Sequence, residues 1–385
     1  MNMRTWAEID MDALKSNIEN IRKITDKKSM IMAVVKADAY GHGAVNIAKH
    51  LLKNGADRLA VADLDEAVEL RRAGIDAPIL ILGASFDEDC EMLVKYDITP
   101  AVFLYDFAKK LSDAAKKLGK TAKVHIKIDT GMSRIGYVSG VDDEAVTEEI
   151  LRISNLPNIF IEGIFSHFAT SDEKDSEYTK KQFSEFMAVC DLLKKKGLDI
   201  PIRHIANSAA IMMYPETHLE MVRAGIILYG FYPSEEVNKD KLALERVMTL
   251  KSRITLIKEI KDRGVSYGKT YIARRNTKVA TVPVGYADGY TRLLNNKAKI
   301  AVNGEPVDVI GRICMDQCMI DVTNVHNINI GDEVIIFGKE VVTADEIAES
   351  LGTINYEIVC MLSRRIPRVY ICEGKVVSTV NYLTE

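Results

Sequence analysis

The stretch MAVVKADAYGHG, residues 32–43, begins as a buried β-strand and then carries a lysine where a buried strand should stay apolar. Four apolar residues lead directly into Lys36, whose ammonium group is costly to take out of water. A loop that contains Tyr40 and two glycines follows at once. The role of this lysine depends on the fold that the surrounding chain forms.

The first 230 residues alternate strand-like runs with helical ones. Helical segments such as LDEAVELRRAGI and SEYTKKQFSEFMAVCDLLKKKG end at Gly74 and Gly197, where glycine is typical of a helix C-terminus. Eight strands with intervening helices predict a (β/α)8 barrel of the TIM type, which usually takes ~250 residues. An open doubly wound sheet is the alternative, but its usual GxGxxG and GxxxxGK[ST] motifs are absent from the sequence. The predicted strands are 30–36, 58–62, 78–83, 99–103, 123–129, 160–167, 202–206 and 221–230.

From about residue 240 the chain becomes rich in strands and turns. One helix is indicated there, because Thr343 and Glu346 form a capping box ahead of IAESLG. We therefore predict an α/β protein with a barrel domain at 1–240 and a smaller, mainly β domain at 241–385. Residues 1–10 contain a short strand, TWAEID, that is a candidate to pair with the second domain.

Composition excludes several classes of function. The formal charge is −4, with 51 basic and 55 acidic residues intermixed, so no basic field for nucleic acid exists and a small-molecule partner is favoured. The N-terminus lacks an apolar stretch for a signal peptide or a membrane span, so we expect a cytoplasmic protein. Six scattered cysteines do not suggest disulfides, and Cys314 and Cys318 lack the further ligands of a metal site.

Polar side chains occur at the predicted ends of several strands. Barrel enzymes place their chemistry at the C-terminal ends of the strands, and Lys36 falls at the first of them. A lysine buried there can act as a nucleophile or base because burial lowers its pKa. The alternative is a structural lysine whose aliphatic part is buried while its ammonium group reaches water. A lysine together with a phosphate site after strands seven and eight suggests pyridoxal phosphate bound as a Schiff base. The other strand-end residues are Lys127, Asp129, His167, Asn207, Ser208, Arg223 and Gly225.

Nine segments, in order along essentially the whole chain, closely resemble the bacterial alanine racemase family. They are 33–43, 61–75, 125–137 (HIKIDTGMSRIGY), 167–173, 204–210 (HIANSAA), 221–230 (MVRAGIILYG), 265–271 (VSYGKTY), 284–290 (VGYADGY) and 311–321 (GRICMDQCMID). The resemblance implies a fold-type III pyridoxal phosphate enzyme that works as a head-to-tail homodimer with shared active sites.

The resemblance also implies roles for individual residues. Lys36 would hold the cofactor and act as the base on one face of the substrate. Tyr267 would be the base on the other face and would come from the partner subunit. Lys127 matches a lysine that is carbamylated in many members, where it orients the arginine matching Arg134.

The remaining implied residues bind the cofactor or the substrate. Tyr40, Ser208, Gly225 and Ile226 would surround the phosphate. His167 would lie against the ring and Arg223 would face the pyridine nitrogen. Arg134 would lie near the cofactor phenolate and the substrate. Met315 would meet the substrate carboxylate through its backbone amide, with Asp316 beside it, and Tyr286 would narrow the entrance. Arg364 departs from the family pattern, because some members have a tyrosine there that contacts the phosphate and supports the catalytic tyrosine.

The implied reaction is the interconversion of L-alanine and D-alanine, which would supply D-alanine for peptidoglycan. Two acid/base groups on opposite faces suit it, because one removes the α-proton and the other delivers a proton. Arginine opposite the pyridine nitrogen disfavours ring protonation and so favours return of the proton to the α-carbon. A racemase for serine or a basic amino acid is the nearest alternative, followed by a non-catalytic pyridoxal phosphate protein; a decarboxylase would be expected to have an acidic residue in place of Arg223.

Overall fold

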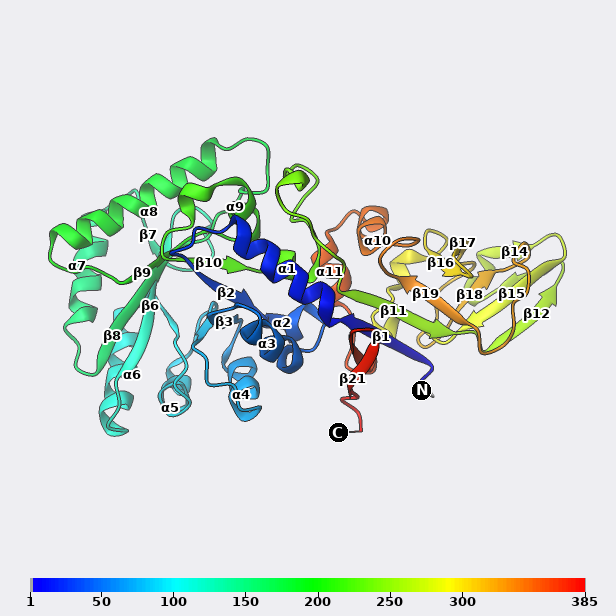
Figure 1. Cartoon of the computed structure of the whole chain (residues 1–385), viewed down its shortest axis with the longest axis horizontal. Coiled ribbons are helices and arrows are strands. Elements are labelled where there is room, and N and C mark those ends of the chain that lie inside the picture. Colours follow the sequence, from blue (N-terminus) through cyan, green and yellow to red (C-terminus); the bar gives the residue numbers. More distant parts are fainter. Residues whose placement is uncertain (1–2, 385) are drawn as a thin grey trace. The chain divides into compact units, whose positions relative to one another are not determined.

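The structure is a computed structural model that describes residues 3–384 (Figure 1). Contacts within the chain divide it into two units. The barrel unit consists of Lys15–Ala39 and Ala44–Leu244, and the β unit consists of Met1–Leu14, Tyr40–Gly43 and Glu245–Glu385. The short segment after Lys36 therefore passes from one unit to the other, which sequence reading did not foresee.

The barrel unit contains eight parallel strands whose pairing closes on itself. The pairs run in the order β2–β3–β4 and β5–β6–β8–β9, and β10 pairs with β2. A parallel bridge between Leu80 and Thr99 joins β4 to β5, and the Arg223 amide donates to the Ala206 carbonyl between β10 and the end of β9. The predicted barrel is confirmed. Its strands are β2 (Met30–Val34), β3 (Arg58–Val61), β4 (Ile79–Ile81), β5 (Ala101–Val102), β6 (Ala122–Asp129), β8 (Ile159–Phe165), β9 (Ile202–His204) and β10 (Met221–Ala224), and the short β7 (Tyr137–Val138) pairs with β6.

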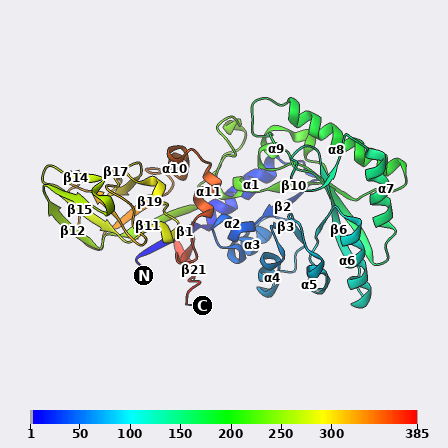
Figure 2. The same cartoon turned by 180° about the vertical axis from the view of Figure 1, so that it is seen from behind.

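Helices of this unit lie on the outside of the strands (Figures 1 and 2). Their ends follow local sequence signals: Asp63 and Asp142 cap helices through their side chains. Gly74 and Gly197 have φ angles of 80° and 90° just beyond two helices, as the glycine signals predicted. The helices are α3 (Ala44–Lys53), α4 (Leu64–Arg72), α5 (Cys90–Lys95), α6 (Tyr105–Lys117), α7 (Asp143–Ser154), α8 (Glu177–Lys195) and α9 (Ser208–Met213). Helix α1 (Met11–Ile24) and the short left-handed segment labelled α2 (Lys36–Tyr40) each include residues of both units.

Most of the predicted strands extend one to six residues beyond the observed ends, and two of these differences bear on the candidate site. The last barrel strand ends at Ala224 rather than at residue 230, because the chain turns at Gly225 and continues as a 3₁₀ helix, η3 (Ile226–Tyr229). The first strand ends at Val34, so Lys36 lies beyond the strand and begins α2. The spacing of apolar residues in the sequence could not locate these two strand ends, because both segments stay apolar beyond the last hydrogen bond of the strand.

The β unit is built around a mixed seven-stranded sheet in the order β17–β16–β19–β11–β1–β20–β21. Its strand β1 (Thr5–Asp10) lies antiparallel to β11 (Met248–Arg253) and parallel to β20 (Arg368–Cys372). The capping box at Thr343 and Glu346 is present at α10 (Ala344–Leu351), which α11 (Asn355–Cys360) follows. The remaining strands are β12 (Leu256–Ile260), β13 (Arg263–Val265), β14 (Tyr271–Ala273), β15 (Thr277–Val282), β16 (Lys299–Val302), β17 (Glu305–Asp308), β18 (Cys318–Asp321), β19 (Glu333–Phe337) and β21 (Lys375–Val380).

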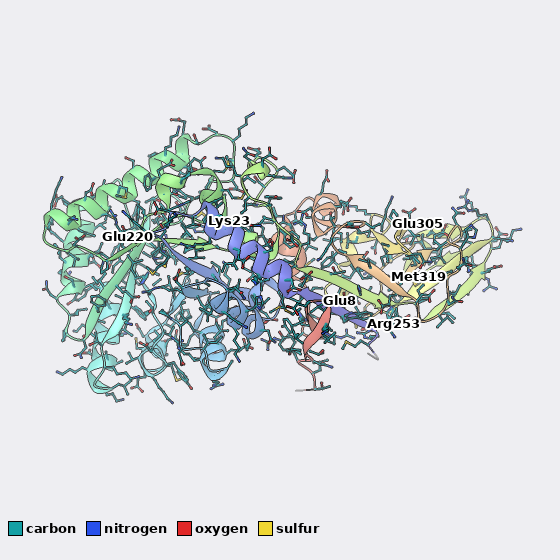
Figure 3. The ribbon with its side chains drawn as sticks, in the orientation of Figure 1. Glu8, Lys23, Glu220, Arg253, Glu305 and Met319 are labelled. Atoms are coloured by element: carbon teal, nitrogen blue, oxygen red, sulfur yellow. The ribbon has the colours of Figure 1, made fainter. Side chains whose placement is uncertain are left out.

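Figure 3 shows how the side chains project from these elements; Glu8 and Arg253 lie on neighbouring strands, β1 and β11. Within residues 3–384, no helix combines the length and the apolar character that crossing a bilayer requires. Over the same residues, no group of three or more histidine, cysteine, aspartate or glutamate side chains is arranged to hold a metal ion.

Candidate active site

Lys36 begins an unusual backbone segment directly after the first barrel strand. The four residues that follow it, Ala37 to Tyr40, all have φ angles of 52–53°, in the left-handed region. For residues with a Cβ this conformation costs roughly 1–2 kcal/mol each, so it persists only where neighbours enforce it. Glu66 is one such neighbour, because its Oε1 accepts the Ala37 amide at 2.6 Å and its Oε2 accepts the Ala62 amide at 2.7 Å. Sequence analysis did not single out Glu66.

Arg223, on β10, is a cation enclosed by the barrel. Its side chain is buried, with 3% of the residue exposed, and its two Nη groups donate to five acceptors. Burial lowers its pKa, and the nearby charge of Arg134 lowers it further, to about 9, so the guanidinium remains protonated at neutral pH. The acceptors are Nδ1 of His204 (2.9 Å), Nδ1 of His167 (3.1 Å), and the carbonyls of His204 (3.1 Å), Ser166 (2.8 Å) and Ile205 (3.0 Å).

His167 lies among positive charges just after β8. Burial moves its pKa well below the usual value, and the charges of Arg223, Arg134, Lys127 and Lys36 move it further in the same direction. The imidazole is therefore neutral. Since Arg223 can only donate, Nδ1 of His167 is the acceptor and Nε2 carries the proton. These interactions gather the predicted residues Lys36, Lys127, Arg134, His167 and Arg223 in one electropositive region of the barrel unit.

Lys127 lies on β6 and is 3% exposed. Burial is the main reason that its pKa falls to about 7; the charges of Arg223 and Arg134 add to the fall, while Asp129 opposes it. Its Nζ donates to the Ile128 carbonyl at 2.7 Å and lies 5.4 Å from the centre of the Phe165 ring. Much of the Lys127 amine is consequently unprotonated near neutral pH, which an exposed lysine is not.

Ser208, Gly225 and Ile226 are brought together where β9 and β10 end. Ser208 begins α9, and its Oγ accepts the Gly225 amide at 3.0 Å. Ile226 begins η3. Backbone amides in the first turn of a helix have no partner within that helix, so the two adjacent helix starts offer donors to an anion. The geometry fits the phosphate-binding role predicted for these three residues.

The β unit holds a second group of predicted residues. Tyr267, Tyr286 and Met315 are 66%, 42% and 53% exposed. The amides of Tyr286 and Ala287 donate to the carbonyls of Cys314 and Met315 at 3.1 and 3.0 Å, which places Tyr286 beside Met315. A Cβ on Gly285 would approach both carbonyl oxygens to 2.4 Å, so this turn requires glycine.

Hydrogen bonds to neighbouring residues hold the segments that carry Tyr267 and Asp316. Ser266, which precedes Tyr267, has a φ of 60° and donates its hydroxyl to the Arg312 carbonyl at 2.5 Å. Asp316 Oδ1 accepts from Arg365 Nη2 at 2.8 Å. Cys314 Sγ lies 3.4 Å from the Ser266 hydroxyl, so this cysteine has a packing contact within the group.

Tyr40 and Arg364 also lie in the β unit. Tyr40 is 7% exposed, with its ring centre 6.1 Å from that of Tyr356. The guanidinium of Arg364 lies over the ring of Tyr382, 5.2 Å from its centre. The structure thus places Tyr40, Tyr267, Tyr286, Met315 and Asp316 in one unit and the other predicted site residues in the second.

A (β/α)8 barrel with a lysine just past its first strand, a buried arginine and two adjacent helix starts at its strand ends, together with a β-rich unit, defines an α/β-barrel enzyme. Comparisons with known proteins make this more specific. Residues 9–233 match the model of the alanine racemase N-terminal domain, and residues 247–370 match that of the alanine racemase C-terminal domain. The chain belongs to the alanine racemase family.

Individual relatives support this membership over the full length. An alanine racemase of Clostridium tetani is 54% identical over 383 residues, which cover 98% of each chain. The solved structure of an alanine racemase from Clostridium difficile 630 has a TM-score of 0.97 at 48% identity and covers 100% of both chains. An alanine racemase from Bacillus anthracis, solved with bound L-Ala-P, has a TM-score of 0.93 at 39% identity and covers 100% of this chain and 99% of that one.

The lowered pKa of Lys127 leads to a testable prediction about carbamylation. A neutral amine adds carbon dioxide to give a carbamate and a proton, so Lys127 should form one on incubation with ¹³C-bicarbonate. We expect a carbamate ¹³C signal that Lys127→Met abolishes and that Lys123→Met, on the exposed part of the same strand, leaves in place. The neutral fraction rises as the pH increases through about 7, so labelling should be poor well below that pH. A signal that survives in Lys127→Met would contradict the assignment.

Proposed function

We propose that the chain interconverts L-alanine and D-alanine with pyridoxal phosphate as cofactor and with two bases, Lys36 and Tyr267. Family membership and full-length relatives named alanine racemase support the activity. The observation that carries the chemistry is Arg223, a buried cation at the end of the last barrel strand, in the electropositive region that includes Lys36. The product would serve as the D-alanine of peptidoglycan.

The residues present fit pyridoxal phosphate. Among the described residues, Nε of Arg223 has no hydrogen-bond partner, although the Nη groups have five acceptors, so one donor remains for a ring nitrogen. Ser208 and the amides that begin α9 and η3 would hold the phosphate, with Tyr40 beside it, and Lys36 would hold the aldehyde carbon covalently. Pyridoxal phosphate, when bound, supplies the electron sink that makes the α-hydrogen of an amino acid acidic.

Arg223 would control which reaction follows removal of the α-proton. A guanidinium has no acceptor, so it can donate to the pyridine nitrogen but cannot protonate it fully without losing its own charge. The ring then remains a weaker electron sink than one paired with a carboxylate. Return of a proton to the α-carbon is favoured over reactions that need strong delocalisation, which suits racemisation.

Lys36 and Tyr267 would exchange protons with opposite faces of the α-carbon. Lys36 would act through its Nζ. The residue begins α2, just beyond the end of β2, and so lies at the strand-end region of the barrel. Tyr267 would come from a second copy of the chain, since it is 66% exposed and stands with the exposed Tyr286 and Met315. A phenol needs help to act as a base near neutrality, and the Nε2–H of His167, whose Nδ1 is engaged by Arg223, would donate to its oxygen.

The remaining residues would bind the substrate and shape the entrance. Arg134 would lie near the cofactor phenolate and would be oriented by carbamylated Lys127. The Met315 amide would donate to the substrate carboxylate, with Asp316 beside it, and Tyr286 would narrow the entrance. Arg364 would approach the phosphate in place of the tyrosine found in some members, although its guanidinium is engaged with Tyr382.

The proposed function is tested by incubating the purified chain with pyridoxal phosphate and L-alanine and measuring D-alanine. Rates with L-serine and L-lysine at matched concentrations separate an alanine racemase from a racemase of broader or different specificity. Faster turnover of serine or lysine than of alanine would overturn the assignment. No turnover of any amino acid by cofactor-loaded protein would instead favour a non-catalytic binding role, against which the matching C-terminal domain argues.

The shared active site is tested with two inactive variants. Lys36→Ala and Tyr267→Ala should each lose most of the activity, since a positioned acid/base group typically contributes about 10²–10⁴-fold. When the two are mixed and allowed to exchange fully, about half of the dimers are mixed, and one of their two sites carries neither lesion. Roughly a quarter of wild-type activity should therefore return. Differently tagged chains recovered together prove exchange; no recovery despite exchange would place both bases in one chain.

A further inference from the structure

A chain of buried polar side chains runs through the barrel away from the electropositive region. It begins at Arg223, whose Nη1 lies 2.9 Å from Nδ1 of His204. His204 Nε2 lies 2.8 Å from Nδ1 of His125, and His125 Nε2 lies 3.2 Å from Oε2 of Glu162. Arg58 Nη1 closes the chain at 2.5 Å from the same carboxylate oxygen. We call His204, His125 and Glu162 the relay.

Only one arrangement of protons satisfies every contact in the relay. Arginine donates and never accepts, so Nδ1 of His204 is an acceptor and Nε2 of His204 must carry the proton. That proton is donated to Nδ1 of His125, which places the proton of His125 on Nε2, facing Glu162. A proton on Nδ1 of His125 would require His204 to accept at both nitrogens, which a neutral imidazole cannot do.

Burial and charge support this arrangement. His125 and His204 are both 0% exposed, and burial is the largest cause that lowers the pKa of each, so both rings are neutral. Burial alone would raise the pKa of Glu162, but the hydrogen bonds from His125 and Arg58 outweigh it and bring the value to about 2. The far end of the relay is therefore a carboxylate, which only accepts.

Packing keeps the two rings in register. His204 stacks on Phe165, with ring centres 4.9 Å apart and planes within 4°, and it meets His125 edge to face at 5.0 Å. A Cβ at Gly163, on the neighbouring strand, would approach the His125 ring atoms to 2.5 Å, so any larger residue at this position would clash with the imidazole. Neither ring can turn over without displacing its neighbours.

We propose that Glu162 and His125 are positioning residues for Arg223: from the end of the relay opposite the guanidinium they hold His204 in the Nε2–H tautomer that Arg223 requires, and so give Nη1 a permanent acceptor that holds the plane of the guanidinium. The inference rests on the proposed function only in placing Arg223 Nε against the pyridine nitrogen. Loss of the His204 imidazole contact would leave Nη1 with the His204 carbonyl as its one remaining acceptor among the described residues, and the guanidinium could then tilt away from the ring nitrogen. A cooperative chain ending in an anion strengthens each hydrogen bond along it.

The direct test is the tautomeric state of the histidines, read by ¹⁵N NMR in the full-length protein with and without pyridoxal phosphate. The chain has only seven histidines, so single His→Gln or His→Asn variants assign the signals. We expect neutral Nε2–H tautomers at His125, His204 and His167 in the wild type. An Nδ1–H tautomer or an imidazolium at His204 or His125 would overturn the proposal, whatever the variants below do.

Glu162→Gln tests the anionic end, since an amide can donate as well as accept and no longer fixes the direction of the relay. We expect the His125 and His204 signals to move toward mixed tautomers, and kcat for alanine to fall about tenfold at little-changed KM, as for other outer partners of a ligating group. Glu220→Gln is the matched control. Glu220, labelled in Figure 3, precedes β10 and pairs with Arg203 at 2.6 Å, outside the relay.

Four outcomes test the proposal. Equal losses in Glu162→Gln and Glu220→Gln, or an unchanged Glu162→Gln, would overturn the proposal. If Glu162→Gln does not fold, Arg58→Met replaces it. In Arg58→Met the Glu162 carboxylate still accepts from His125, so the histidine tautomers should stay as in the wild type even if stability falls. Altered tautomers in this variant would contradict the proposal. In the last outcome, the histidines show the expected tautomers while the ¹⁵N signal of Arg223 Nε is the same with and without pyridoxal phosphate. That result would support the relay and would refute only the placement of Arg223 at the pyridine nitrogen.

Discussion

A single buried arginine organises the chemistry of the barrel unit. Arg223 is 3% exposed, and among the described residues its guanidinium makes no ion pair; carbonyl groups and two imidazoles solvate it instead. Because it can only donate, it requires an unprotonated Nδ1 on both His204 and His167, and at His204 the Glu162 end of the relay requires the same tautomer. The orientation of the catalytic region thus follows from one group that has no alternative hydrogen-bonding role.

The same cation shapes its neighbours through the electric field. Its charge, with that of Arg134, adds to burial in lowering the pKa of Lys127, and it helps to keep His167 neutral. Phe165 lies near two cations, with Lys127 Nζ 5.4 Å and Arg223 Cζ 5.6 Å from its ring centre. An aromatic face can stabilise such charges by ~0.5–2 kcal/mol without providing a carboxylate that would compete for the same protons.

Much of the fold followed from the sequence, and part of the site did not. The eight strands were evident from their apolar runs, whereas the left-handed segment after Lys36 has no local signal, since alanine and aspartate adopt it only under tertiary constraint. Tyr267, taken alone, reads as one aromatic residue in a turn; only its resemblance to the family singled it out. The relay was missed because His125, His204 and Glu162 lie on three different strands, and only the packing of the barrel brings their side chains together. One signal was available: His125, Lys127 and Asp129 alternate along β6 and so share one face of the strand.

The central claim is that protons are exchanged by two different groups on opposite faces of the substrate. The most direct measurement is racemisation of L-alanine by the wild-type enzyme in D₂O, followed by mass spectrometry of the α-position in both enantiomers at low conversion. Two bases predict deuterium in the D-alanine formed while the remaining L-alanine keeps its original hydrogen. Original hydrogen carried over into D-alanine, or label appearing equally in both enantiomers from the start, would indicate a single base and contradict the account.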